Sequence, residues 1–149
     1  MNDDKLITLT GSLGCLSNSL GRLFWNNCFD YISFKKIITI LNVSLLCICI
    51  SCLFIENKYL FIVIVNLSYF FGGSYYGLMP TQTVRVIGEK HGTTFYSFIF
   101  SFFAFASIVQ FLVHEFVIIK WGIGGFRYVF IGFCVIQIIS IGLILMFRF

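Results

Sequence analysis

Six cysteines and two histidines are the side chains of this chain most able to bind a metal or act as nucleophiles. A zinc site needs paired ligands on a loop, usually with histidines. Cys49 and Cys52 have a paired spacing, but they lie inside an apolar run with no second pair, and both histidines are far from the cysteines. No nucleophile has an adjacent base. The thiols are therefore interpreted as small apolar packing residues, and the sequence predicts no metal, no cofactor and no enzyme.

His114 and Glu115 are a neighbouring titratable pair that could take part in proton coupling. The alternative is that the two side chains lie at the membrane–water interface and have no coupling role, because both can reach water at the end of a helix. Ser107, Gln110 and His114 are spaced so that they share one helical face.

Uncharged polar residues also lie deep inside apolar runs, where they are costly and usually face the interior of a helix bundle or a wet cavity. The candidates for a substrate path are Asn18, Asn66, Tyr69, Ser107 and Gln110. Asn42 and Gln137 are further polar positions of this kind. The alternative is a set of interhelical hydrogen bonds worth about 0.6 kcal/mol each.

The chain that must position these residues is too apolar for a water-soluble globule. Of its 149 residues, 59% are hydrophobic and 11% charged, whereas soluble domains carry about 25% charged residues. High hydrophobicity also excludes a disordered chain. The basic residues are scattered singly, so nucleic acid is not an expected partner. The composition predicts an integral, multi-pass membrane protein whose partner is the lipid bilayer.

Five stretches contain no Asp, Glu, Lys or Arg, and four of them have about the 20 apolar residues that a spanning helix needs. They are apolar at odd and even positions alike, which disfavours barrel strands. Helices also satisfy their own backbone hydrogen bonds in lipid. The prediction is an all-α membrane protein, a single transmembrane domain over residues 1–149. Its five transmembrane helices are expected at about 6–25, 37–55, 59–79, 93–118 and 127–147.

The basic residues predict the orientation of these helices. Six of the ten fall on the side of the first loop and the C-terminus, which the positive-inside rule places in the cytoplasm. They are Arg22, Lys35, Lys36, Arg85, Lys90 and Arg148. No Lys or Arg lies in the middle of a charge-free stretch, which disfavours an organic-anion carrier.

The loop between the first two helices carries a charged motif. Its residues are Gly21, Arg22, Trp25, Asp30, Lys35 and Lys36. This motif resembles the signature loop of the major facilitator superfamily. The resemblance is to the Gly-Arg-x-x-Trp form in the second half of oxalate/formate-antiporter-like and monocarboxylate-porter-like members.

An acid near a helix N-terminus is favoured by the macrodipole and can hold a cation across the bundle. Arg22 and Asp30 are therefore expected to form one gate latch. The alternative is that the charges of this loop only anchor helix ends at the headgroups and set the topology.

A second segment resembles the tenth helix, the following loop and the start of the eleventh helix of the same family. Gly72, Gly73, Pro80, Gly88, Lys90, Gly92 and Tyr96 carry this resemblance. Gly73 and Gly77, like Ser17 and Gly21, form a small-x-x-x-small pair that lets a neighbouring helix approach closely. Gly72, Gly73 and Pro80 are also expected to ease helix bending, or else to serve close packing alone.

The resemblance implies the eighth to twelfth helices of a major facilitator carrier, part of its six-helix C-terminal half. It implies alternating-access transport of a small solute such as a monocarboxylate or another organic anion. Five helices cannot form the two-repeat cavity of such a carrier, so the expected partners include the missing helices of the same carrier or other subunits. A lone monomer is not expected to transport. The alternative function is a non-transporting membrane scaffold or assembly subunit.

Overall fold

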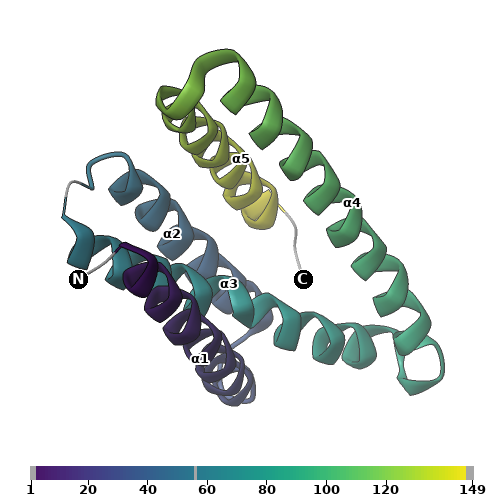
Figure 1. Cartoon of the computed structure of the whole chain (residues 1–149). Helices are drawn as coiled ribbons and strands as arrows, with labels where there is room; N and C mark the ends of the chain where they lie inside the picture. Colours follow the sequence, from purple (N-terminus) through teal and green to yellow (C-terminus); the bar gives the residue numbers. More distant parts are fainter. Residues whose placement is uncertain (1–2, 56, 147–149) are drawn as a thin grey trace.

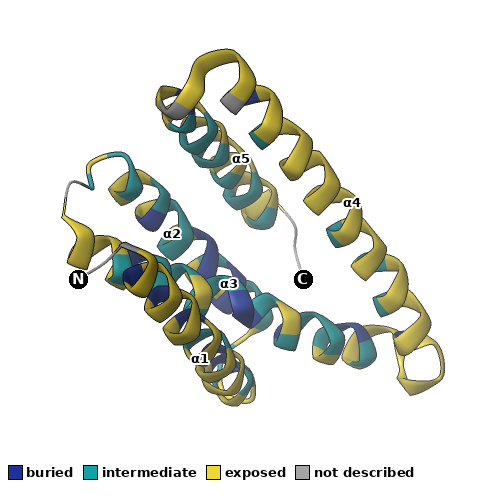
Figure 2. Cartoon of the chain, in the orientation of Figure 1, coloured by how far each residue is buried: buried dark blue, intermediate teal, exposed yellow. Residues whose placement is uncertain are grey.

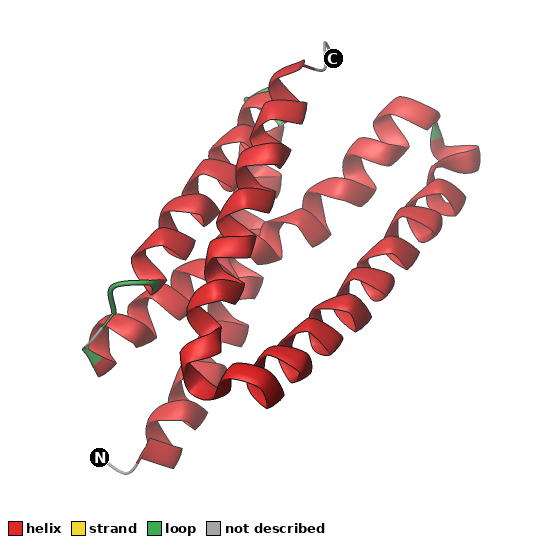
Figure 3. Ribbon diagram, turned by 90° about the horizontal axis from the view of Figure 1, so that it is seen from above, coloured by secondary structure: helices red, strands yellow, loops and turns green. Residues whose placement is uncertain are grey.

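Helices make up nearly all of the protein in the computed structural model, which describes residues 3–55 and 57–146 (Figure 1). In order they are α1 (Asp3–Phe29), α2 (Phe34–Cys52), α3 (Lys58–Ile87), α4 (Glu89–Trp121), the 3-10 helix η1 (Gly122–Gly125) and α5 (Phe126–Met146). Short connections join them (Figure 3). Neither described range contains a strand, so the predicted all-α fold is confirmed.

Four of these helices, α2, α3, α4 and α5, are long and apolar enough to cross a membrane. α1 has 27 residues against 19 in α2, so length does not set it apart. It begins with charged residues and is interrupted by Gly, Ser and Asn, and it is not among the four. The crossing of the bilayer by α1 therefore stays a prediction.

The helices extend beyond most of their predicted ends. α1 continues past Trp25 to Phe29, and α3 continues past Pro80 to Ile87. The stretch from 80 to 91, which falls between two predicted helices, is helical except at Gly88, whose φ of 89° is easily adopted by glycine. α2 instead starts and ends about three residues earlier than predicted. The predicted end at residue 147 lies outside the described residues.

The polar segment after Pro80 remains helical, and two of its side chains bond to the helix itself. Thr81 and Thr83 donate hydrogen bonds to carbonyl oxygens four residues back. A proline inside a membrane helix is tolerated when nearby hydroxyls and neighbouring helices satisfy the backbone groups it frees. Charge and polarity in this stretch therefore did not mark the end of the helix.

Each of α2, α3, α4 and α5 contacts two others of this set, and α1 joins them mainly through α3. α1 lies against α3, and α2 packs on both α3 and α5. α4 turns back from the end of α3, contacts α3 and α5, and makes no contact with the described parts of α1 or α2 (Figure 1). Buried side chains concentrate where α1, α2 and α3 meet, in a core of Trp25, Phe29, Ile37, Leu41 and Leu78.

Large apolar side chains cover the outer surface of α4 and α5, where almost the whole of α4 is exposed (Figure 2). In the most apolar stretch of each of these two helices, only 6% is buried. Contiguous apolar surface of this extent is rare on soluble monomers. It fits helices that face lipid tails.

α1 and α3 approach each other through glycines. An added Cβ on Gly21 would collide with the carbonyl oxygen of Phe70. On Gly73 it would lie 2.5 Å from Asn18 Oδ1, and on Gly77 2.8 Å from Asn26 Nδ2. Small residues that allow such close backbone contact are typical of interfaces between membrane helices.

Gly21→Ala should lower the stability of the protein by about 1–3 kcal/mol, since overpacking a tight contact forces the backbone apart. Gly11→Ala is the matched control in the same helix, because a Cβ at Gly11 would meet open space. Reversible unfolding by a denaturing detergent in mixed micelles measures both variants. Equal effects of the two substitutions would contradict the close packing of α1 on α3.

Candidate functional site

An ion pair links the ends of α1 and α3. Arg85 Nη2 donates to Asp30 Oδ1 at 2.8 Å, and the Arg85 guanidinium carbon lies 4.2 Å from the centroid of the Phe29 ring. The two helices run parallel, so their C-terminal ends lie together. Arg85 stands in the last turn of α3, where the macrodipole favours a cation. The predicted latch between Arg22 and Asp30 is therefore corrected, because the structure pairs Asp30 with Arg85.

Arg22 lies inside α1 and makes different contacts. Its Nε donates to Asn18 Oδ1 at 2.9 Å, and its guanidinium carbon lies 5.3 Å from the centroid of the Tyr76 ring. Because α1 ends at Phe29, Arg22 is about 10 Å from the end of the helix. The side chain is exposed. This cation therefore lies within the helix, as the predicted span of about residues 6–25 implied.

Three of the five predicted path residues meet at the interface between α1 and α3. Ser17 Oγ donates to Asn66 Oδ1 at 3.2 Å, and Asn66 Nδ2 donates to the carbonyl of its own helix. Asn18 lies against Gly73, and the Tyr69 ring lies against Gly14. These side chains therefore contribute to helix packing at this interface.

The other two predicted path residues, Ser107 and Gln110, lie apart from that group. Both are exposed on α4, which does not contact the described part of α1. Ser107 Oγ donates to the carbonyl of Phe103 in its own helix. The structure therefore does not bring the five residues into one path.

The predicted proton-coupling pair is also on α4. The His114 ring packs at 5.1 Å from the centroid of the Phe126 ring, and Glu115 is exposed. Neither side chain makes an ion pair or hydrogen bond within residues 3–55 and 57–146.

The two lysines of the motif lie in the first turn of α2. Lys35 Nζ donates to the carbonyl oxygen of Leu145 at 3.1 Å, in the last turn of α5. Lys36 is exposed. The cation of Lys35 thus meets the negative end of the α5 dipole.

The remaining predicted packing or bending positions are all on α3. A Cβ added at Gly72 would meet open space, so this glycine makes no close helix contact within the described chain. Gly73 and Gly77 face α1, and Pro80 lies within the helix.

Asn42 connects α2 to two other helices. It is 4% exposed, its Oδ1 accepts from Ser140 Oγ at 3.1 Å, and its Nδ2 donates to the carbonyl of Ile38. Tyr75 of α3 also interacts with it. Sequence reasoning identified Asn42 as polar at depth but missed both partners. It also missed Arg85 as the partner of Asp30, although a cation close to a helix C-terminus was a usable signal.

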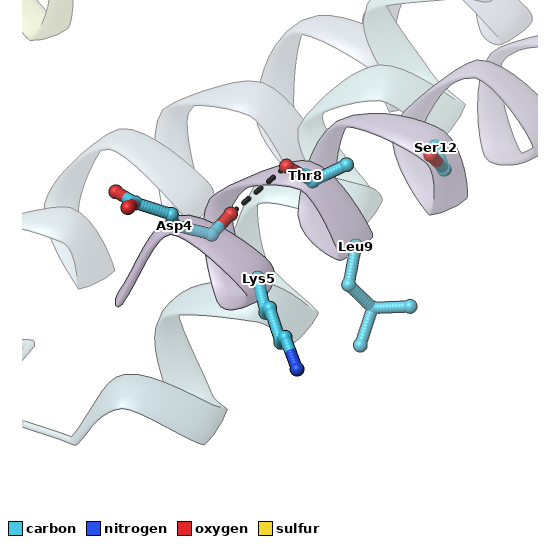
Figure 4. Close-up of a pocket in the computed structure, with 5 residues that line it drawn as sticks. All are labelled: Asp4, Lys5, Thr8, Leu9 and Ser12. Carbon is cyan, nitrogen blue, oxygen red and sulfur yellow. Dashed lines mark hydrogen bonds between the residues drawn. The ribbon is translucent and has the colours of Figure 1, made fainter. Parts of the chain in front are cut away.

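A shallow depression on α1 is lined by Asp4, Lys5, Thr8, Leu9 and Ser12 (Figure 4). All five residues come from the first three turns of one helix, and Thr8 Oγ1 donates to the carbonyl of Asp4. Within residues 3–55 and 57–146, no second element lines it. Among the described residues, no group of three His, Cys, Asp or Glu side chains could hold a metal ion.

Comparison with protein-family models, with curated proteins and with solved structures gives no match.

Replacing both Asp30 and Arg85 by alanine should show a coupling energy of about 0.2–1 kcal/mol in a double-mutant cycle, the range of exposed ion pairs. The side chains of Arg85 and Asp30 are 49% and 62% exposed, so added salt should weaken the coupling. Detergent unfolding at low and high salt measures it. The matched cycle of Asp30 with Arg22 should show none. Coupling in that second cycle alone would contradict the observed pairing.

Proposed function

We propose that this chain is part of a membrane carrier that moves a small organic anion by alternating access. The observation that carries the proposal is the position of Arg22. It is an exposed cation about 10 Å inside α1, and it has no carboxylate partner within the described residues. Ionisable residues inside membrane segments are expensive and usually mark a substrate or ion pathway.

The contacts of Arg22 favour an anionic solute with a planar charged group. Among the described residues, Asn18 is bonded to the Nε of Arg22 alone, while the Tyr76 ring lies beside the guanidinium. The remaining N–H groups of an arginine form a fork that matches a carboxylate. A monocarboxylate or another small organic anion is therefore the class of solute that these contacts support.

The ion pair of Asp30 with Arg85 supports a gating role at the ends of α1 and α3. Exposed pairs of this kind contribute only about 0–1 kcal/mol, so a modest movement can break and remake them. Arg85 is also on the segment that resembles the tenth helix of the major facilitator carriers. The proposal assigns this pair, in place of Arg22 with Asp30, to the latch.

Other helices complete the carrier in this proposal. Alternating access needs two repeats that move around a shared site, and five helices do not supply them. The exposed apolar surface of α4 and α5 offers area for such helices as well as for lipid.

A scaffold or assembly subunit is the second candidate. The observation that favours it is the use of deep polar side chains as bonds between helices, as in Ser17 with Asn66 and Ser140 with Asn42. Changing these residues in a scaffold would weaken the association of its helices. It would not change solute flux, because a scaffold carries none.

Uptake of radiolabelled lactate and formate into sealed vesicles from cells producing the chain tests the proposal. Arg22→Gln should lower the initial rate at least about tenfold, the equivalent of ~1.4 kcal/mol, because the anion loses its fixed cation. Arg127→Gln is the matched control, because Arg127 is exposed at the start of α5 and unpaired in the described chain. Variant abundance in the membrane is measured by immunoblot.

An unchanged rate for Arg22→Gln at full abundance would refute the anion site. Uptake no greater than in vesicles without the chain, together with recovery of the chain in a larger membrane complex, would favour the scaffold.

A further inference from the structure

Three thiols converge between α2 and α5, away from Arg22 and from the ion pair of Asp30 with Arg85. Cys49 and Cys52 lie in the last turn of α2, and Cys134 lies in α5. Cys49 and Cys52 are both near enough to Cys134 to interact with it electrostatically. All three are partly buried and free of disulfides.

The register of the two helices places Cys49 opposite Cys134 independently of the thiol contact. Residues 35, 42 and 49 are spaced by two turns, so they share one face of α2. Lys35 bonds to Leu145 at 3.1 Å, and Asn42 bonds to Ser140 at 3.1 Å. The helices are antiparallel, so the next position along this face of α2 meets the turn of α5 that contains Cys134.

We infer that Cys49 and Cys134 are a redox modification site, and that a small-molecule disulfide converts them to a disulfide that fixes α5 to α2. One thiolate attacks the oxidant to give a mixed disulfide, and the second thiolate displaces the remaining small thiol. The two cysteine thiols lose two electrons and two protons, which leave on two molecules of small thiol. No other reactant is needed.

The place of the pair in the fold makes the reaction feasible. Cys49 is one turn from the end of α2, about 5 Å along the helix, so a membrane-permeant oxidant can reach it from the interface. The orientation predicted from the basic residues puts this end of α2 on the non-cytoplasmic side, where disulfides persist. α5 is mostly exposed and relies on α2 for much of its packing. A covalent bond would hold it in the docked position until reduction.

The test treats membrane vesicles containing the full chain with dithiodipyridine, a permeant disulfide, and then measures the intact mass. The test variant keeps only Cys49 and Cys134, with the other cysteines replaced by serine. It should lose two hydrogens in mass, whereas separated thiols would each gain a thiopyridyl group. The matched variant keeps only Cys47 and Cys134. Cys47 is exposed and about 200° around the helix from Cys49, so this variant should carry two thiopyridyl groups.

Peptide mapping of the oxidised wild-type chain provides a readout that does not depend on any variant. It should contain a peptide pair joined through Cys49 and Cys134, absent after treatment with dithiothreitol. Two thiopyridyl groups on the Cys49 and Cys134 variant would overturn the inference. So would equal closure of the Cys47 and Cys134 variant, or bonds found only between two chains.

Discussion

Lipid tails are as apolar as the outer side chains of these helices, so burying apolar area does not drive one helix onto another inside a bilayer. Close contact must come from small residues and from polar pairs. α1 and α3 meet in this way, with Gly21 against the Phe70 carbonyl and Gly73 against Asn18. The rest of the structure depends on this contact. It aligns the two helices in parallel, which brings Asp30 to Arg85 and Arg22 to Tyr76.

The other helices show what happens with fewer such contacts. α5 is held to α2 by two polar bonds along one face, from Lys35 to Leu145 and from Ser140 to Asn42, both in the first half of α2. α4 has one close glycine, Gly92 against Val84 of α3, and among the described residues it makes no side-chain hydrogen bond to another helix. It exposes nearly all of its surface (Figure 2). It contacts α3 chiefly through rings, such as Phe100 and Phe103 with Tyr76. It is therefore the helix with the most surface left for lipid or for another helix.

Charge-free runs predicted the presence of the helices, because a helix that spans a bilayer needs about 20 mostly apolar residues. Their ends were harder to predict, because α3 continues past Pro80 through polar residues such as Thr81 and Thr83, whose hydroxyls bond to their own helix. Partners between helices could not be predicted, since they depend on how each helix is rotated about its axis. For this reason Asp30 was assigned to Arg22, and Ser107 was grouped with Asn18 although α4 does not contact α1.

The central claim is that short turns send α1, α2 and α3 back and forth across a bilayer. Tyr31 and Tyr59, which are 91% and 72% exposed, mark the two successive connections. Each is replaced by cysteine in a chain whose native cysteines are changed to serine, and sealed vesicles are treated with a membrane-impermeant maleimide. The account predicts that one position reacts at once and the other only after the vesicles are opened. Reaction of both positions from the same compartment would contradict it.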